Sequence, residues 1–172
     1  MYYTKEFIDC IKQKVKESHI PPIYNPEEWS KRSRDFNCYA YVLQINNISL
    51  EELDPGFTIG ITMKKKEITA ESVLKNFLID CENLNLNVSK TTIDEEIGKD
   101  AYKIALFVIN GFTFHFIRQD GNGAWSHKRG WLDPIAIINE SDILKEDNLY
   151  KLVGIFKISK KKEWISLFFL FT

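Results

Sequence analysis

Residues 101–130 read AYKIALFVINGFTFHFIRQDGNGAWSHKRG, and this stretch decides the fold class. Its first eighteen positions are rich in Ile, Val, Phe and Tyr and partly alternate with polar residues, which is typical of β-strands. Asn110-Gly111 is a strong hairpin signal, and the glycine-rich run 119–123 predicts a second turn. The sequence therefore predicts an antiparallel meander whose third strand covers residues 124–127.

The N-terminal half of the chain favours helices instead. Apolar residues recur at helical spacing over residues 4–18 and again over residues 70–84. A shorter helix is predicted over residues 37–44, with Asp35 or Asn37 as its N-cap. Helices followed by a meander indicate an α+β fold in which the N-terminal helices pack on one side of an antiparallel sheet.

The length of 172 residues suits one domain, so we expect a single domain over residues 1–172. We expect this domain to consist of an N-terminal helix at residues 4–18, a core at residues 24–130 and C-terminal strands at residues 131–172. The pattern of apolar residues adds three further strand candidates, at residues 57–62, 150–158 and 163–171.

A formal net charge of −1 excludes a generally basic protein that coats nucleic acid, and 13% aromatic residues exclude an acidic disordered chain. The three cysteines form no motif and fit a reducing compartment. The N-terminus does not resemble a signal peptide, so the sequence predicts a cytoplasmic protein. The apolar run 164–171 is too short to span a membrane as a helix. We expect a buried final strand there, with a membrane or partner contact as the alternative.

Three residues carry the candidate chemistry: Cys38, His115 and His127. Cys38 begins a predicted helix, where the macrodipole and the free backbone N–H groups favour a thiolate. The two histidines flank a tight turn and can face each other. One imidazole beside the thiol would act as general base and acid, and the other would orient it. Asn37 or the backbone amide of Cys38 can contribute to an oxyanion hole.

Other interpretations of these residues stay open. Cysteine is among the most buried residue types, so Cys38 can be a packing residue. His115 and His127 can be ordinary strand residues. The three can also bind zinc, although only three ligands are present and no close ligand pair anchors them. The third position of a triad is open as well, because the same hairpin carries Asp120, Asn122 and Ser126.

Two short blocks resemble the NlpC/P60 cysteine peptidases. Residues 36–40, Phe-Asn-Cys-Tyr-Ala, are similar to that family's Phe-Asp-Cys-Ser-Gly block, and residues 53–57, Leu-Asp-Pro-Gly-Phe, to its Leu-x-Pro-Gly-Asp block. The resemblance implies a papain-like fold and cleavage of amide bonds in cell-wall peptides. It also implies that Cys38 is the nucleophile, His115 the base and His127 the third residue.

The Asn-Cys-Tyr-Ala-Tyr block at 37–41 and the Trp-Ser-His-Lys block at 125–128 are also similar to a subgroup of small bacterial and phage proteins. The family resemblance suggests that the Tyr24 hydroxyl lies near the thiol. Residues around Cys38 and His127 are expected to line a cleft for an acidic or aromatic group. These residues are Tyr39, Trp125, Ser126, Lys128, Arg129 and Trp131.

The leading hypothesis is a thiol hydrolase, a peptidase or amidase, that attacks an amide or ester carbonyl and forms an acyl-enzyme. It needs a peptide or another amide-containing substrate and no cofactor, metal or nucleic acid. One alternative is a non-catalytic binding protein or phage-encoded inhibitor on the same scaffold. Another is an intracellular deamidase or protease effector with the same three residues.

Overall fold

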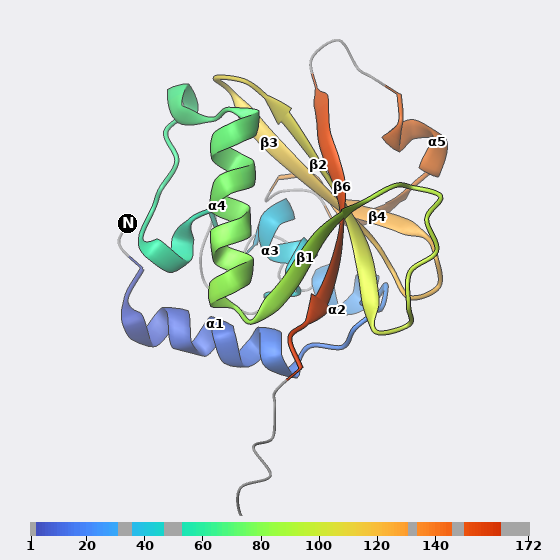
Figure 1. The fold of residues 1–172 in the computed structure, drawn as a ribbon, viewed down its shortest axis with the longest axis horizontal. Helices are drawn as coiled ribbons and strands as arrows, with labels where there is room; N and C mark the ends of the chain where they lie inside the picture. Colours follow the sequence, from blue (N-terminus) through green and yellow to red (C-terminus); the bar gives the residue numbers. More distant parts are fainter. Residues whose placement is uncertain (1–2, 31–35, 47–52, 131–133, 146–149, 163–172) are drawn as a thin grey trace, which may run out of the picture.

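The computed structural model describes residues 3–30, 36–46, 53–130, 134–145 and 150–162, which form an α+β fold (Figure 1). The α-helices are α1 (Lys5–Glu17), α2 (Pro26–Ser30), α3 (Cys38–Val42), α4 (Ala70–Asn83) and α5 (Glu140–Ile143). Two 3₁₀ helices precede α4, namely η1 (Phe57–Ile59) and η2 (Lys65–Glu67). The strands are β1 (Leu86–Thr91), β2 (Ala101–Ile109), β3 (Thr113–Gln119), β4 (Trp125–Lys128), β5 (Ile135–Ile138) and β6 (Lys151–Lys160).

The strands form one antiparallel sheet in the order β1-β6-β2-β3-β4-β5. The predicted meander is confirmed as β2, β3 and β4. Gly111 between the first two strands has a φ of 73°, a conformation that glycine adopts without steric cost. The strand expected at 150–158 is β6, which lies between β1 and β2. The C-terminal part of the chain therefore completes the middle of the sheet.

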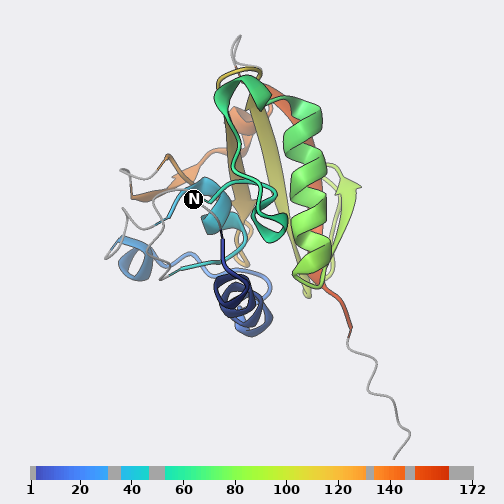
Figure 2. The same cartoon turned by 90° about the vertical axis from the view of Figure 1, so that its left-hand side faces the viewer.

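The two faces of the sheet border different cores, because successive side chains of a strand point to opposite faces. Tyr102, Ile104 and Leu106 of β2 belong to the larger core, which the sheet shares with α1, α3 and α4. Phe107 belongs to a smaller core on the other face, together with Ile143 of α5. Figure 2 shows α4 running along the sheet, with α1 seen end-on below it.

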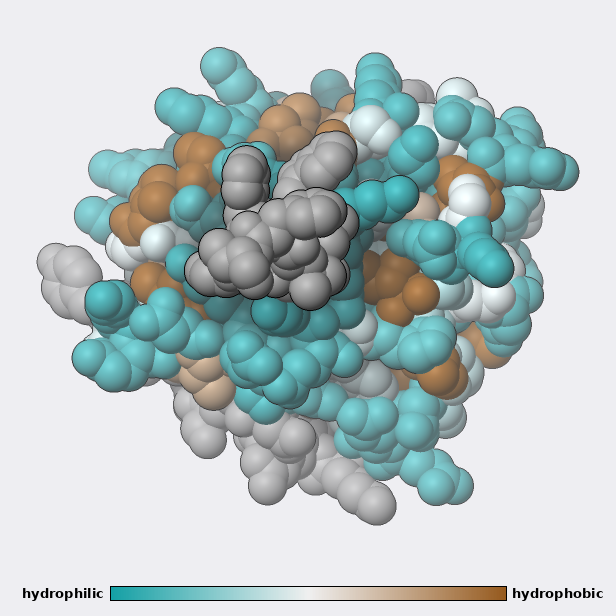
Figure 3. Space-filling view, turned by 60° about the horizontal axis from the view of Figure 1, so that its bottom comes forward, coloured by the Kyte–Doolittle hydropathy of each residue, from teal (hydrophilic) through white to brown (hydrophobic). Residues whose placement is uncertain are grey.

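The helices expected at 4–18 and 70–84 are confirmed as α1 and α4. Each is capped by the threonine before it, whose hydroxyl accepts a backbone N–H, at 3.2 Å for Thr4 and 3.0 Å for Thr69. Figure 3 brings forward the side that α1 occupies at the bottom of Figure 1. Hydrophilic residues predominate on this face, and hydrophobic ones form separate patches. Among the described residues, no helix is both long and apolar enough to span a membrane.

The prediction of a strand at residues 57–62 is wrong, because this segment contains the 3₁₀ helix η1. Gly56 and Gly60 flank η1 and both have left-handed φ values, 99° and 76°. The buried Asp80 carboxylate of α4 accepts the backbone N–H groups of Gly56 and Thr58, at 2.6 and 3.0 Å. The backbone here is therefore bound to a helix side chain and is not available to a neighbouring strand.

The sequence analysis did not predict two of the described strands. Some of its other predictions concern residues outside the described part of the chain. β1, Leu-Asn-Val-Ser-Lys-Thr, is mostly polar, and β5 has only four residues, so neither produces a strong pattern. The expected final strand at 163–171 and the apolar run 164–171 lie outside the described part of the chain, as does Asp35. The sequence expectations for these segments stay predictions.

Candidate functional site

Cys38 is the first residue of α3, as the sequence predicts, and Asn37 is the N-cap. The Asn37 Oδ1 accepts the backbone N–H groups of Tyr39 and Ala40, both at 3.1 Å, and its Nδ2 donates to the Leu53 carbonyl at 2.9 Å. Both ends of the side-chain amide are therefore used to fix the start of α3. Asn37 supports the position of the cysteine, and its Nδ2 group keeps a second hydrogen as a donor, so its expected part in an oxyanion hole stays a prediction.

The two histidines meet across the β3–β4 hairpin. His127 pairs with Ile117, and His115 lies two positions before Ile117, so both imidazoles are on the face of the smaller core. The Nε2 of His115 and the Nδ1 of His127 are 3.1 Å apart, a hydrogen-bonding distance. One imidazole can therefore orient the other, as expected from the sequence.

Cys38, His115 and His127 all line one cavity of about 840 Å³. In the described strand pairs, β4 covers β3 only as far as the Ile117–His127 pair, so the first part of β3 has an open edge. Cys38 and Phe114 line the cavity from the side of the larger core, and His115 and Ile117 line it from the other side. The cavity therefore extends around the open edge of β3 and reaches all three candidate residues.

Burial dominates the electrostatics of the thiol. Cys38 is 4% exposed, and its burial raises the pKa of the thiol to about 11. Hydrogen bonds from the backbone of Phe116, Cys38 and Tyr39 and the positive charge of Lys128 lower this pKa but do not offset the burial. Among the described contacts, no hydrogen bond joins the thiol to His115. In the free protein the thiol is therefore protonated at neutral pH.

The imidazole of His115 is neutral over the same pH range. Burial, the neighbouring His127 and the positive charge of Arg129 lower the pKa of His115 from 6.5 to about 3. A neutral imidazole can accept a proton, which a base requires, although the low pKa makes it a weak base. The site in the free protein is thus a neutral thiol and a neutral imidazole at one cavity.

This low pKa predicts a specific loss of stability in acid. Between pH 6.5 and 3 the unfolded chain binds a proton at His115 and the folded protein does not, so stability falls as the pH is lowered through this window. The contribution approaches about 1.4 kcal/mol per pH unit within the window. We expect His115→Gln to flatten the pH dependence of the unfolding free energy, as measured by urea denaturation.

His19→Gln is the matched control for this experiment. His19 is exposed, and one of its ring nitrogens lies 2.7 Å from the Pro21 carbonyl oxygen. The control variant should keep the wild-type dependence on pH. If wild type and His115→Gln lose stability equally between pH 6.5 and 3, His115 is not held neutral by the fold.

Four of the expected substrate contacts are core residues instead. Tyr39, Trp125, Ser126 and Lys128 are each exposed by 2% or less, and none lines the cavity. Tyr39 donates to Asp80 at 2.7 Å, and the Lys128 ammonium donates to the Gly130 carbonyl at 3.0 Å. These residues are polar or amphipathic, which suggests a binding surface, but each has a partner inside the fold. Trp131 lies outside the described residues.

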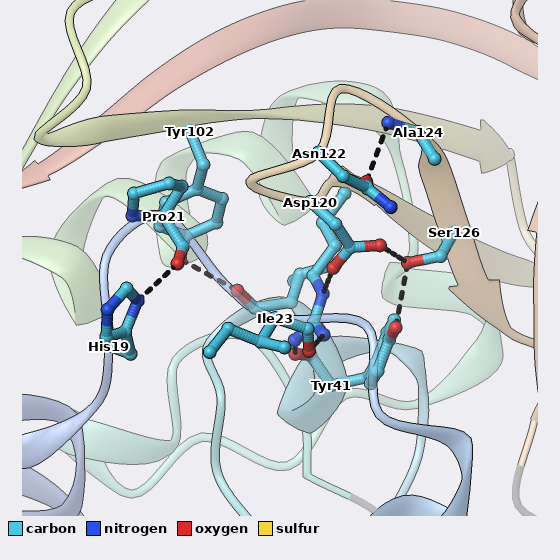
Figure 4. Close-up of polar contacts among 11 residues, drawn as sticks. His19, Pro21, Ile23, Tyr41, Tyr102, Asp120, Asn122, Ala124 and Ser126 are labelled. Atoms are coloured by element: carbon cyan, nitrogen blue, oxygen red, sulfur yellow. Dashed lines mark hydrogen bonds and ion pairs between the residues drawn. The ribbon is translucent and has the colours of Figure 1, made fainter.

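Ser126 and Asp120, two alternatives for the third position of a triad, belong to a separate buried network (Figure 4). Ser126 Oγ donates to Asp120 at 2.5 Å and lies 2.8 Å from the Tyr41 hydroxyl. Arg118 completes the network with an ion pair to Asp120 at 2.9 Å. The alternation along β3 and β4 places Arg118 and Ser126 on the face opposite the histidines. The other alternative, Asn122, is exposed in the turn, and its Oδ1 accepts the backbone N–H of Ala124.

Tyr24 is not among the residues that line the cavity. Its ring packs against the larger core, and it adds to the effect of burial in raising the pKa of Tyr41. Sequence reasoning missed several residues that do line the cavity, because no local motif links them to Cys38. They come from η2, the β2–β3 turn, α5 and the segment after it, and the residue before β6, and include Lys65, Phe112, Asp142, Lys145 and Tyr150.

The comparisons with known proteins place the chain in a family. Neither the search of curated proteins nor the search of solved structures found a match. A family model described as "Domain of unknown function (DUF7689)" matches residues 27–161, which include the cavity with Cys38 and both histidines. The chain therefore belongs to the DUF7689 family.

Proposed function

We propose that the protein is a thiol hydrolase that acts on an amide or ester bond in the cavity beside Cys38. One observation carries the proposal: Cys38, at the start of α3, and the hydrogen-bonded pair His115–His127 line the same cavity. A nucleophile, a base and a group that orients the base are the parts that acyl transfer requires. The resemblance to NlpC/P60 peptidases, in the same residues and chain order, supports the same assignment.

The histidine pair suggests the direction of proton transfer. When His115 Nε2 carries its hydrogen and donates to His127 Nδ1, the lone pair of His115 Nδ1 is left to take the thiol proton. The sulfur of Cys38 then bonds to the substrate carbonyl carbon, and the proton passes from His115 to the leaving amine or alcohol as its bond to the carbonyl breaks. Water attacks the resulting thioester and releases the acid and the free thiol.

Two features of the site bear on the thiolate. The backbone N–H groups that favour negative charge on the sulfur come from Phe116, Cys38 and Tyr39, at the open edge of β3 and the start of α3. The thiol and His115 lie on opposite sides of this edge and must meet through the cavity. Catalytic hydrogen bonds are often long in free enzymes and shorten only with substrate bound.

The second candidate function is a binding protein that uses the same cavity without chemistry. The pKa of about 11 for Cys38 and the lack of a described hydrogen bond to His115 favour it. Turnover of amide and ester substrates by wild type, Cys38→Ala and Cys10→Ala separates the two candidates. A hydrolase loses turnover only in Cys38→Ala, whereas a binding protein has none that depends on Cys38.

A further inference from the structure

The cavity combines positively charged side chains with aromatic ones. Lys65, Arg129 and Lys145 line it together with the carboxylates Asp54 and Asp142. Asp142 forms an ion pair with Lys145, and Asp54 accepts the backbone N–H of Met63 at 2.9 Å. Within the described part of the chain, no carboxylate pairs with Arg129 or Lys65. Among the described residues that line the cavity, the cations therefore outnumber the carboxylates by three to two.

Arg129 is placed close to the candidate chemistry. It follows β4 directly and lies two residues after His127. Arg129 and His115 line the same cavity, and the positive charge of Arg129 adds to burial and His127 in lowering the pKa of His115. A guanidinium is always charged and binds carboxylates through paired N–H donors. An anionic group bound to Arg129 would thus lie beside the reacting residues.

Aromatic residues supply the apolar wall of the same cavity. Phe107, Phe112, Phe114 and Tyr150 all line it. Phe112, in the β2–β3 turn, is 56% exposed, and the Lys65 ammonium lies 5.2 Å from the centre of its ring. An exposed aromatic side chain beside a cation at a cavity wall is suited to a ligand that has both an apolar body and a negative charge.

We propose that the substrate carries a carboxylate attached to an aromatic body, with the carboxylate paired to Arg129 and the aromatic ring packed against Phe112. The proposal rests on the hydrolase function for the substrate's acyl chemistry, but binding of such an anion is measurable without turnover. The volume of about 840 Å³ is within the range of cavities that hold small organic ligands.

The probe is 3-phenylpropanoate, and its binding is followed by the shifts of backbone amide signals in two-dimensional NMR. We expect saturable shifts at the cavity, and at least about tenfold weaker binding to Arg129→Gln, since a charge-assisted hydrogen bond is lost. Arg129→Lys should keep part of the affinity. Lys90→Gln removes an exposed cation of β1, outside the cavity, and should bind as wild type does.

Two further ligands test the two halves of the proposal in wild type. The neutral 3-phenylpropanamide should bind at least about tenfold more weakly than the acid, because it offers no charge to Arg129. Inorganic phosphate, an anion without an apolar body, should also bind more weakly. Equal binding of the amide overturns the role of Arg129, and equal binding of phosphate overturns the aromatic part. A lack of saturable binding by 3-phenylpropanoate overturns both.

Cys38→Ala separates this proposal from the hydrolase function. The variant should still bind 3-phenylpropanoate, because the thiol makes no contact that this binding requires. If turnover survives in Cys38→Ala while binding still depends on Arg129, the hydrolase function fails and the anion site stands. If turnover is lost in Cys38→Ala while 3-phenylpropanoate binds equally to wild type and Arg129→Gln, the hydrolase function stands and the anion site fails.

Discussion

Replacing Cys38 by Ala is expected to reduce turnover of amide and ester substrates by at least about a thousandfold, the order of loss seen when an enzyme nucleophile is removed. The reason is chemical, because alanine cannot form the thioester. The same change removes only one buried sulfur, so the free energy of unfolding should fall by no more than about 1.5 kcal/mol. Steady-state kinetics and urea denaturation measure the two effects on the same sample.

The matched control for this loss is Cys10→Ala. Cys10 is an exposed cysteine on α1 and is absent from the lining of the cavity, so its removal should leave turnover unchanged. Cys38→Ser keeps the size of the side chain and replaces the thiol by a weaker nucleophile, and should be nearly as inactive as Cys38→Ala. Undiminished turnover in Cys38→Ala would rule out thiol catalysis.

The second large effect is on stability, and it concerns Arg118. This residue is 1% exposed, pairs with Asp120 at 2.9 Å and donates to the carbonyls of Tyr41 and Ile23 at 3.0 and 3.2 Å. Its guanidinium also lies 3.8 Å from the centre of the Tyr41 ring. Arg118→Met removes the charge and leaves Asp120 buried without its cation. We expect a loss of about 3–5 kcal/mol in the free energy of unfolding.

Lys161→Met provides the comparison for Arg118→Met, because Lys161 forms an ion pair with Glu82 in which the two side chains are 32% and 73% exposed. Solvent screens such a pair, so its loss should cost about 0–1 kcal/mol. Urea denaturation of both variants measures the difference. A loss in Arg118→Met no larger than in Lys161→Met would mean that the buried network stabilises the fold no more than an exposed ion pair does.

Local sequence patterns predict the parts of this fold that depend on neighbouring residues. The meander of β2, β3 and β4 follows from Asn110-Gly111 and the glycine-rich turn after β3. Helices α1 and α4 follow from their threonine caps and apolar spacing. The segment 57–62 was beyond such reasoning, because its conformation depends on Asp80, which is more than twenty residues away in the chain.

In the candidate site, too, local patterns predict some features and the packing of the whole fold determines others. The position of Cys38 at a helix start and the contact between His115 and His127 follow from local patterns, a capping residue and one hairpin. The burial of individual side chains does not follow from these local patterns. The sequence analysis expects Lys128 to line a cleft, yet it is fully buried and its ammonium lies 5.2 Å from the centre of the Phe36 ring. The packing of α3 on β3 and β4 decides this, and it is a property of the whole fold.

The central claim, that Cys38 forms a covalent acyl intermediate, is tested most directly with 4-nitrophenyl acetate as a generic acyl donor. Release of 4-nitrophenolate is followed in the first turnover, and mass spectrometry of the quenched protein maps the acetyl group. The account predicts a burst and an acetyl group on Cys38 in wild type and in Cys10→Ala, and neither in Cys38→Ala. A burst that persists in Cys38→Ala, or acetylation confined to Cys10 and surface lysines, would contradict it.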